Sequence, residues 1–143
     1  MNGQTKKQML EKLDALRKYI KFLESYKTYS PEEIEDNYTV QSAVERNMHL
    51  ALECVIDIGE MLISLEKLEK PASNREIILL LGKNKILPPD FARKFAPAMG
   101  LRNILVHQYD KIDHERLQRH MKDEIEDFDI FARHIIKYLK KSK

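Results

Sequence analysis

The apolar and polar positions of this chain alternate mainly with helical spacing. Between residues 5 and 26 apolar side chains recur at steps of three and four, with Lys, Glu and Asp between them, which predicts an amphipathic helix. The apolar stripe consists of Met9, Leu13, Leu16, Ile20 and Leu23. Next, Ser30 to Glu33 has the pattern of a capping box with Pro31 at a first helical position, so a short connecting helix is expected there.

The longest predicted helix covers residues 38–69, where the sequence has no proline and Gly59 is the only glycine. One apolar row comprises Val44, Met48, Ala51, Val55, Ile58, Leu62 and Leu65, and a second comprises Ala43, Leu50, Leu52, Ile56 and Ile63. So wide an apolar arc predicts a helix that is central in the fold and also shared with a second subunit.

Turn residues divide the rest of the chain into further helices. Pro71 is expected to end the long helix, and Gly82 to stop the short helix that follows. Another helical stretch is expected from Phe91 to about residue 106, where Pro97 kinks or divides it. Asp113 is a candidate N-cap for the last helix, which runs to the basic end of the chain.

The pattern therefore predicts an all-α fold: an antiparallel helical bundle of four principal helices with short extra helices. A length of 143 residues suits a single domain over 1–143. The lone Cys54 excludes a disulfide framework and is interpreted as a core residue in a reducing compartment. The first residues do not resemble a signal peptide and no apolar run reaches membrane-spanning length, so a cytoplasmic protein without membrane contact is expected.

Charge gives little information about function on its own. A net charge of +2 is too near balance to indicate a nucleic-acid binder, so any RNA site must be a local patch. Neither His-Glu-x-x-His nor Glu-x-x-His occurs, and we expect no catalytic metal and no cofactor. The acidic run over 123–129 is interpreted as a solvated helix face, and His134 as a surface residue.

Four polar side chains capable of chemistry surround a short apolar run before the last helix: Arg102, Asn103, His107 and Tyr109. On a continuous helix Arg102 and His107 would differ in direction by about 140°, so they converge best where the helix ends between them. We therefore expect a helix-to-loop junction. From these residues alone, the preferred interpretation is that Arg102 is a helix-end cation and His107 a polar loop residue that satisfies carbonyl groups.

Arg102, Asn103, His107 and Tyr109 match the pattern Arg-x4-His-x-Tyr without a gap, and in this respect the chain resembles the HEPN superfamily, specifically HepT-type toxins. The resemblance extends through Ile56-Asp57-Ile58-Gly59 and covers most of the chain. It implies a homodimeric, metal-independent endoribonuclease toxin whose two motifs meet at a cleft along the dimer interface. It also implies that a cognate MntA-type nucleotidyltransferase antitoxin neutralises the toxin by transferring AMP to Tyr109.

The chemistry of RNA cleavage assigns a role to each residue of the motif. Attack by the 2′-hydroxyl needs a proton acceptor, a proton donor and positive charge beside the phosphoryl oxygens. We expect neutral His107 as the base, the second subunit's copy as the acid, and Arg102 as the phosphate contact. Asn103 supports this arrangement, and Tyr109 contributes to fine positioning besides being the modification site.

A polar stripe on the long helix comprises Arg46, His49, Glu53, Asp57 and Glu60. It either lines the cleft and holds Arg102 or His107 by ion pairs, or forms a solvent-facing salt-bridge ladder.

The main alternative function is a noncatalytic helical subunit that presents a nucleotide or substrate to a nucleotidyltransferase, with Arg102 contacting phosphate only. A purely structural dimer is the third possibility.

Overall fold

The computed structural model describes residues 2–107 and 114–141, with only the backbone described for 106–107 and 114–120. Every regular element in these ranges is helical, which confirms the predicted all-α class. The elements are α1 (Gly3–Glu24), α2 (Pro31–Glu35), α3 (Tyr38–Leu65), α4 (Asn74–Lys83), α5 (Pro89–Phe95), the 3₁₀ helix η1 (Ala96–Met99), α6 (Gly100–His107) and α7 (His114–Lys141).

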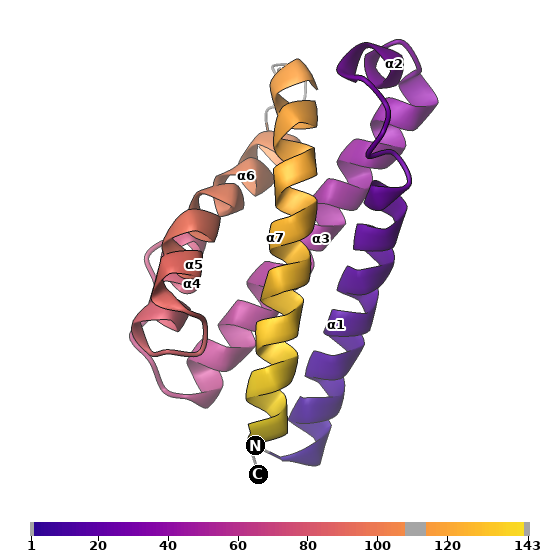
Figure 1. Ribbon diagram of the computed structural model, residues 1–143. Helices are drawn as coiled ribbons and strands as arrows, with labels where there is room; N and C mark the ends of the chain where they lie inside the picture. The colour runs from indigo at the N-terminus through magenta and orange to yellow at the C-terminus, as the bar shows by residue number, and fades with distance from the viewer. Residues whose placement is uncertain (1, 108–113, 142–143) are drawn as a thin grey trace.

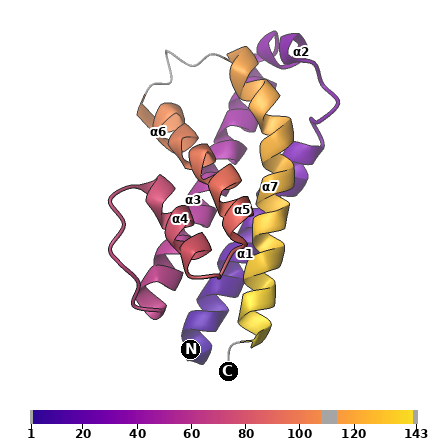
Figure 2. The same cartoon turned by 60° about the vertical axis from the view of Figure 1, so that its left-hand side comes forward.

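Helices α1, α3 and α7 form the long part of the bundle, and α4, α5 and α6 pack on one side of it (Figures 1 and 2). Helix α1 runs antiparallel to both α3 and α7 (Figure 1). Helix α3 contacts α1, α2, α4, α6 and α7, so it is central within this single chain, as its two apolar rows predicted. None of the helices in the described part of the chain is long and apolar enough to cross a membrane.

The core consists of the apolar stripes that the sequence predicted. All five stripe residues of α1 are buried, and the Ser30–Glu33 capping box is formed in both directions at the start of α2. On the inner face of α7 the buried residues are Met121, Ile125, Phe128, Phe131, Ala132, Ile135 and Leu139. Local periodicity therefore placed the long helices and the faces that they bury.

The long helix α3 ends earlier than expected, at Leu65 rather than near residue 69. Lys67 adopts a left-handed backbone conformation with φ 53°, and two backbone hydrogen bonds close the helix end: Lys67 N–H donates to the Ser64 carbonyl and Leu68 N–H to the Ile63 carbonyl. This is the Schellman arrangement, with Lys where glycine is usual. Pro71 lies beyond the helix and does not terminate it.

The prediction that Gly82 stops α4 is wrong. Helix α4 continues through Lys83, and the left-handed residue is Lys85 at φ 61°. Gly82 is instead a point of close approach, because a Cβ there would lie 2.4 Å from the Ala92 Cβ of α5. Gly59 does the same for α3 and α4, since its Cβ would meet Ile77 Cγ2 at 2.4 Å. These two glycines set how closely α4 packs against its neighbours.

Pro97 divides the next helical stretch, one of the two outcomes expected for it, and η1 separates α5 from α6. Phe95 at the end of α5 is fully buried and stands edge-on to Phe128 of α7, with ring centroids 5.9 Å apart. Its centroid is also 5.8 Å from that of Phe131. This aromatic cluster fixes the segment from which α6 begins.

The acidic run on α7 is only partly solvated, contrary to the expectation. Asp127 is buried and accepts a hydrogen bond from Lys94 Nζ of α5 at 3.2 Å. Burial, with the charges of Asp127 and Asp123, raises the pKa of Glu124 to about 7. His134 is also half-buried rather than at the surface, with its ring 5.9 Å from that of Phe91. The approach of α5 covers this side of α7.

Candidate functional site

The residues with the potential for phosphate chemistry lie where α6 contacts α3. Arg102, in the first turn of α6, extends to α3, and its Nε–H donates a hydrogen bond to Glu53 Oε1 at 2.5 Å. The two side chains are 31% and 30% exposed. The ion pair is therefore partly desolvated, yet its outer side is open to a ligand.

Two further residues of α3 continue the network from Glu53. The Nε2 atom of His49 lies 3.3 Å from Glu53 Oε1, the same oxygen that Arg102 contacts. On the other side of the ring, Nη1 of Arg46 lies 3.2 Å from His49 Nδ1. Arg46, His49 and Glu53 follow each other at steps of three and four, so they share one face of α3.

The donors and acceptors in this network fix the tautomer of His49. An arginine side chain has only donors, so Nδ1 of His49 must accept the hydrogen bond from Arg46 and carries no hydrogen. Nε2 then carries the hydrogen and donates it to the Glu53 carboxylate. Both ring nitrogens are occupied within α3.

Glu53 is suited to remain ionised in this setting. Burial by itself would raise its pKa, but the hydrogen bonds and charge supplied by Arg102 and His49 outweigh burial and lower the pKa below its ordinary value. A carboxylate that accepts two hydrogen bonds on one oxygen is an anchor for Arg102 and a poor proton acceptor for a substrate.

Arg102 keeps part of its guanidinium group available. Its Nη1 also donates to Asn103 Oδ1, at 3.3 Å. Among the residues that the structure describes, Arg102 is contacted only at Nε and Nη1, which leaves both hydrogens of Nη2 and one of Nη1 without a partner. Each of these hydrogens can donate to an oxygen of a phosphate.

The expected end of the helix between Arg102 and His107 is wrong. Helix α6 continues from Gly100 through His107, so the two backbone positions belong to one helix and differ by about 140° around its axis. Leu105 is buried and Leu101 is partly buried against the core, and α6 contacts both η1 and α3. The side chain of His107 and the whole of Tyr109 lie outside the described residues.

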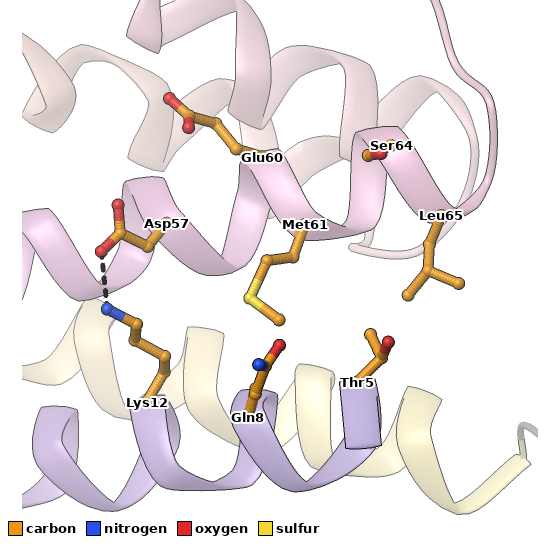
Figure 3. A pocket seen from close by; sticks show the side chains of 8 residues that line it. All are labelled: Thr5, Gln8, Lys12, Asp57, Glu60, Met61, Ser64 and Leu65. Carbon is orange, nitrogen blue, oxygen red and sulfur yellow. Dashed lines mark hydrogen bonds and ion pairs between the residues drawn. The ribbon is translucent and has the colours of Figure 1, made fainter. Parts of the chain in front are cut away.

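Asp57 lies on α3, as Glu53 does, but belongs to a different cluster. It pairs with Lys12 of α1, with Nζ and Oδ2 2.9 Å apart (Figure 3). The pair stands at one end of an open groove of about 540 Å³ between α1 and α3, lined by Thr5, Gln8, Lys12, Asp57, Glu60, Met61, Ser64 and Leu65. In Figure 3 the Met61 side chain points between the two helices, whereas Glu60 points away from Lys12.

The structure thus divides the predicted polar stripe. It brings Glu53 to Arg102 and links Arg46 to Glu53 through His49, whereas Asp57 faces α1. The stripe was visible in the sequence, but the role of His49 as the link was not predicted. Nothing in the sequence indicated Lys12 as the partner of Asp57, since it is one of several lysines on the polar face of α1.

Comparison with known proteins identifies the family of this chain. A model of the ribonuclease HepT-like family matches residues 16–135. The tRNA nuclease HepT of Aphanizomenon flos-aquae is 31% identical over 128 residues, covering 90% of this chain and 87% of that protein. The mRNA nuclease HepT of Shewanella oneidensis is 27% identical over 99 residues, covering 69% of this chain and 74% of that protein.

A solved structure confirms the fold. The tri-AMPylated HEPN toxin of Shewanella oneidensis, in complex with its MNT antitoxin, superposes with a TM-score of 0.81 at 24% identity and covers 96% of this chain and 99% of that one. The resemblance that the motif suggested is therefore confirmed across most of the chain. This chain belongs to the ribonuclease HepT-like family.

Proposed function

We propose that this protein is a metal-independent endoribonuclease toxin in which Arg102 and His107 are catalytic. The observation that supports this most directly is the position of Arg102. A permanently charged fork is held at Nε by Glu53, its Nη2 nitrogen has no partner among the described residues, and its side chain is about one-third exposed. RNA is the proposed substrate, in line with the tRNA and mRNA nucleases among its relatives.

The proposed reaction is transfer of the phosphoryl group to the neighbouring 2′-hydroxyl. Neutral His107 takes the proton of the 2′-hydroxyl as the 2′-oxygen bonds to phosphorus, and the bond from phosphorus to the 5′-oxygen breaks. Protonated His107 of the partner subunit gives its proton to the leaving 5′-oxygen, which yields a 2′,3′-cyclic phosphate and a 5′-hydroxyl. Arg102 stabilises the charge that develops on the phosphoryl oxygens, and Asn103, hydrogen-bonded to Arg102, supports its orientation.

A homodimer is part of this proposal, and the geometry of α6 supports it. Because α6 is continuous, positions 102 and 107 lie on different sides of its axis. Two copies facing each other across a cleft would supply an Arg102 and a His107 from opposite sides. The proposed unit is one HEPN domain over 1–143 per subunit, and a cytoplasmic location remains a prediction.

Neutralisation is proposed to occur by AMP transfer to Tyr109 from a cognate MntA-type nucleotidyltransferase antitoxin. A solved relative is itself a tri-AMPylated toxin in complex with its antitoxin. Added nucleotides would bring bulk and negative charge close to Arg102 and compete with RNA for its outer edge. Intact-mass measurement after coexpression with the antitoxin tests this: the expected increase is one or more AMP units on wild type and none on Tyr109→Phe. A neutralised toxin of unmodified mass would contradict it.

The enzymatic proposal is tested by cleavage of tRNA and messenger RNA in the presence of EDTA. Wild type is expected to cleave, and Arg102→Ala and His107→Ala are expected to lose most activity while keeping the wild-type melting temperature within a few degrees. An inactive wild-type protein would refute the enzymatic proposal and favour the noncatalytic subunit. Equal loss of folding in both variants would show that the motif is architectural.

A further inference from the structure

The face of α3 that meets α6 carries a hydrogen-bonded network of three residues, Arg46, His49 and Glu53. We propose that His49 and Glu53 are positioning residues that fix the guanidinium group of Arg102, with Arg46 holding the His49 ring, so that its outer edge meets an RNA phosphate. The phosphate part of this inference rests on the proposed function. The network itself rests on the hydrogen bonds that link Arg46 to His49, His49 to Glu53, and Glu53 to Arg102.

Arg102 needs such an anchor because its side chain is long and only partly buried. An unrestrained arginine has many rotamers, and the entropy lost on fixing one of them opposes the geometry that phosphate contact requires. Glu53 binds at Nε, the inner end of the fork, and so fixes the plane and direction of the guanidinium without covering its outer edge. Among the described residues only Asn103 contacts an outer nitrogen, Nη1, so Nη2 stays available for the phosphate.

His49 in turn fixes Glu53. It donates from Nε2 to Oε1, the oxygen that accepts from Arg102, and its other nitrogen is held by Arg46 one turn away. Hydrogen bonds along these three side chains can run in one direction only: Arg46 donates to His49, and His49 donates to Glu53. His49, on the same helix as Glu53, therefore holds the carboxylate independently of Arg102 on α6.

The same geometry argues against a direct chemical role for His49. Both of its ring nitrogens have partners, so neither is available to exchange a proton with RNA. Glu53 has a lowered pKa and already accepts two hydrogen bonds on Oε1, so it stays ionised rather than serving as a base. Both residues act through Arg102.

The first test observes the guanidinium without any assay of activity. In ¹⁵N NMR of the full-length protein, the Nε–H of Arg102, assigned by its loss in Arg102→Lys, is expected to be protected from solvent exchange. Glu53→Gln and His49→Ala are expected to speed that exchange at least tenfold. Lys12→Met is the matched control, because it removes a comparable cation–carboxylate pair on α3 outside the network. Unchanged exchange in both network variants would overturn the proposal.

The second test separates positioning from simple loss of packing. His49→Gln retains an amide N–H where Nε2 donates, so it is expected to keep activity within about threefold of wild type. His49→Ala is expected to lower kcat about tenfold, within the range that a misplaced catalytic group costs. Equal loss in both His49 variants would refute the role of Nε2. If wild type cleaves no RNA, the proposed function fails, but the exchange measurement still decides whether the network holds Arg102.

Discussion

The close approach of α4 and α5 at Gly82 gives a prediction that can be worked from the structure. In Gly82→Ala the new methyl group would lie 2.4 Å from Ala92 Cβ, where carbon atoms in contact normally stand about 3.5–4.0 Å apart. The obstacle is a side chain of one carbon, which cannot rotate away, so α5 must move by about 1 Å. Overpacking of this kind costs about 1–3 kcal/mol.

Helix propensity partly offsets that cost. Ala is favoured over Gly within a helix by about 1 kcal/mol, which leaves a net loss of up to about 2 kcal/mol in the free energy of unfolding. For a chain of this size that corresponds to a melting temperature up to about 6 °C lower. Circular dichroism melts at several scan rates measure it.

The control for this prediction is another glycine with free space around it. A Cβ at Gly100 would meet nothing within 4 Å, so Gly100→Ala is expected to melt at or slightly above the wild-type temperature. If Gly82→Ala also melts at or above wild type, the close packing of α4 on α5 does not limit stability and the reasoning is wrong.

Two further predictions concern stability. Because the pKa of Glu124 in the folded protein is about 7, above its ordinary value, the folded state holds that proton more tightly than the unfolded state, and its contribution to stability falls as pH rises from 5 to 8. Glu124→Gln should reduce this fall in the melting temperature, and an unchanged pH dependence would contradict the assignment. Ser30→Ala removes the side-chain cap of α2 and should lower the free energy of unfolding by about 1 kcal/mol in urea titration; a Ser30→Asp variant, which retains a capping oxygen, should lose less.

The sequence predicted those features that depend on local spacing. The stripe of α1 and the capping box of α2 are set by residues within a few positions of one another, and both are confirmed. The end of α4 was predicted wrongly because glycine is usual at helix ends, whereas here Gly82 is required by contact with Ala92 of the next helix. Lys85 takes the left-handed position instead, and a lysine gives no warning of this.

The candidate site shows the same division between local and long-range information. The polar stripe on α3 was visible from its spacing, but Arg102 is 49 positions from Glu53 in the sequence, and only the crossing of α6 over α3 selects Glu53 as its partner. Asp57, one turn further along, meets Lys12 for the same reason. Asp127 became buried because α5 lies over it, which its charged neighbours did not suggest.

The position of Arg102 depends on two separate sets of packing contacts. Glu53 is fixed by α3, whose face is ordered by its own residues, whereas Arg102 is carried by α6, whose place depends on α5 and therefore on Gly82. A movement of α5 by about 1 Å, passed through η1 to α6, would carry Arg102 Nε beyond the ordinary hydrogen-bond distance from Glu53 Oε1. Substitutions where α4 meets α5 should therefore reduce stability and activity together. Loss of the Lys12–Asp57 pair, which lies one turn further along α3 and faces α1, should affect stability alone.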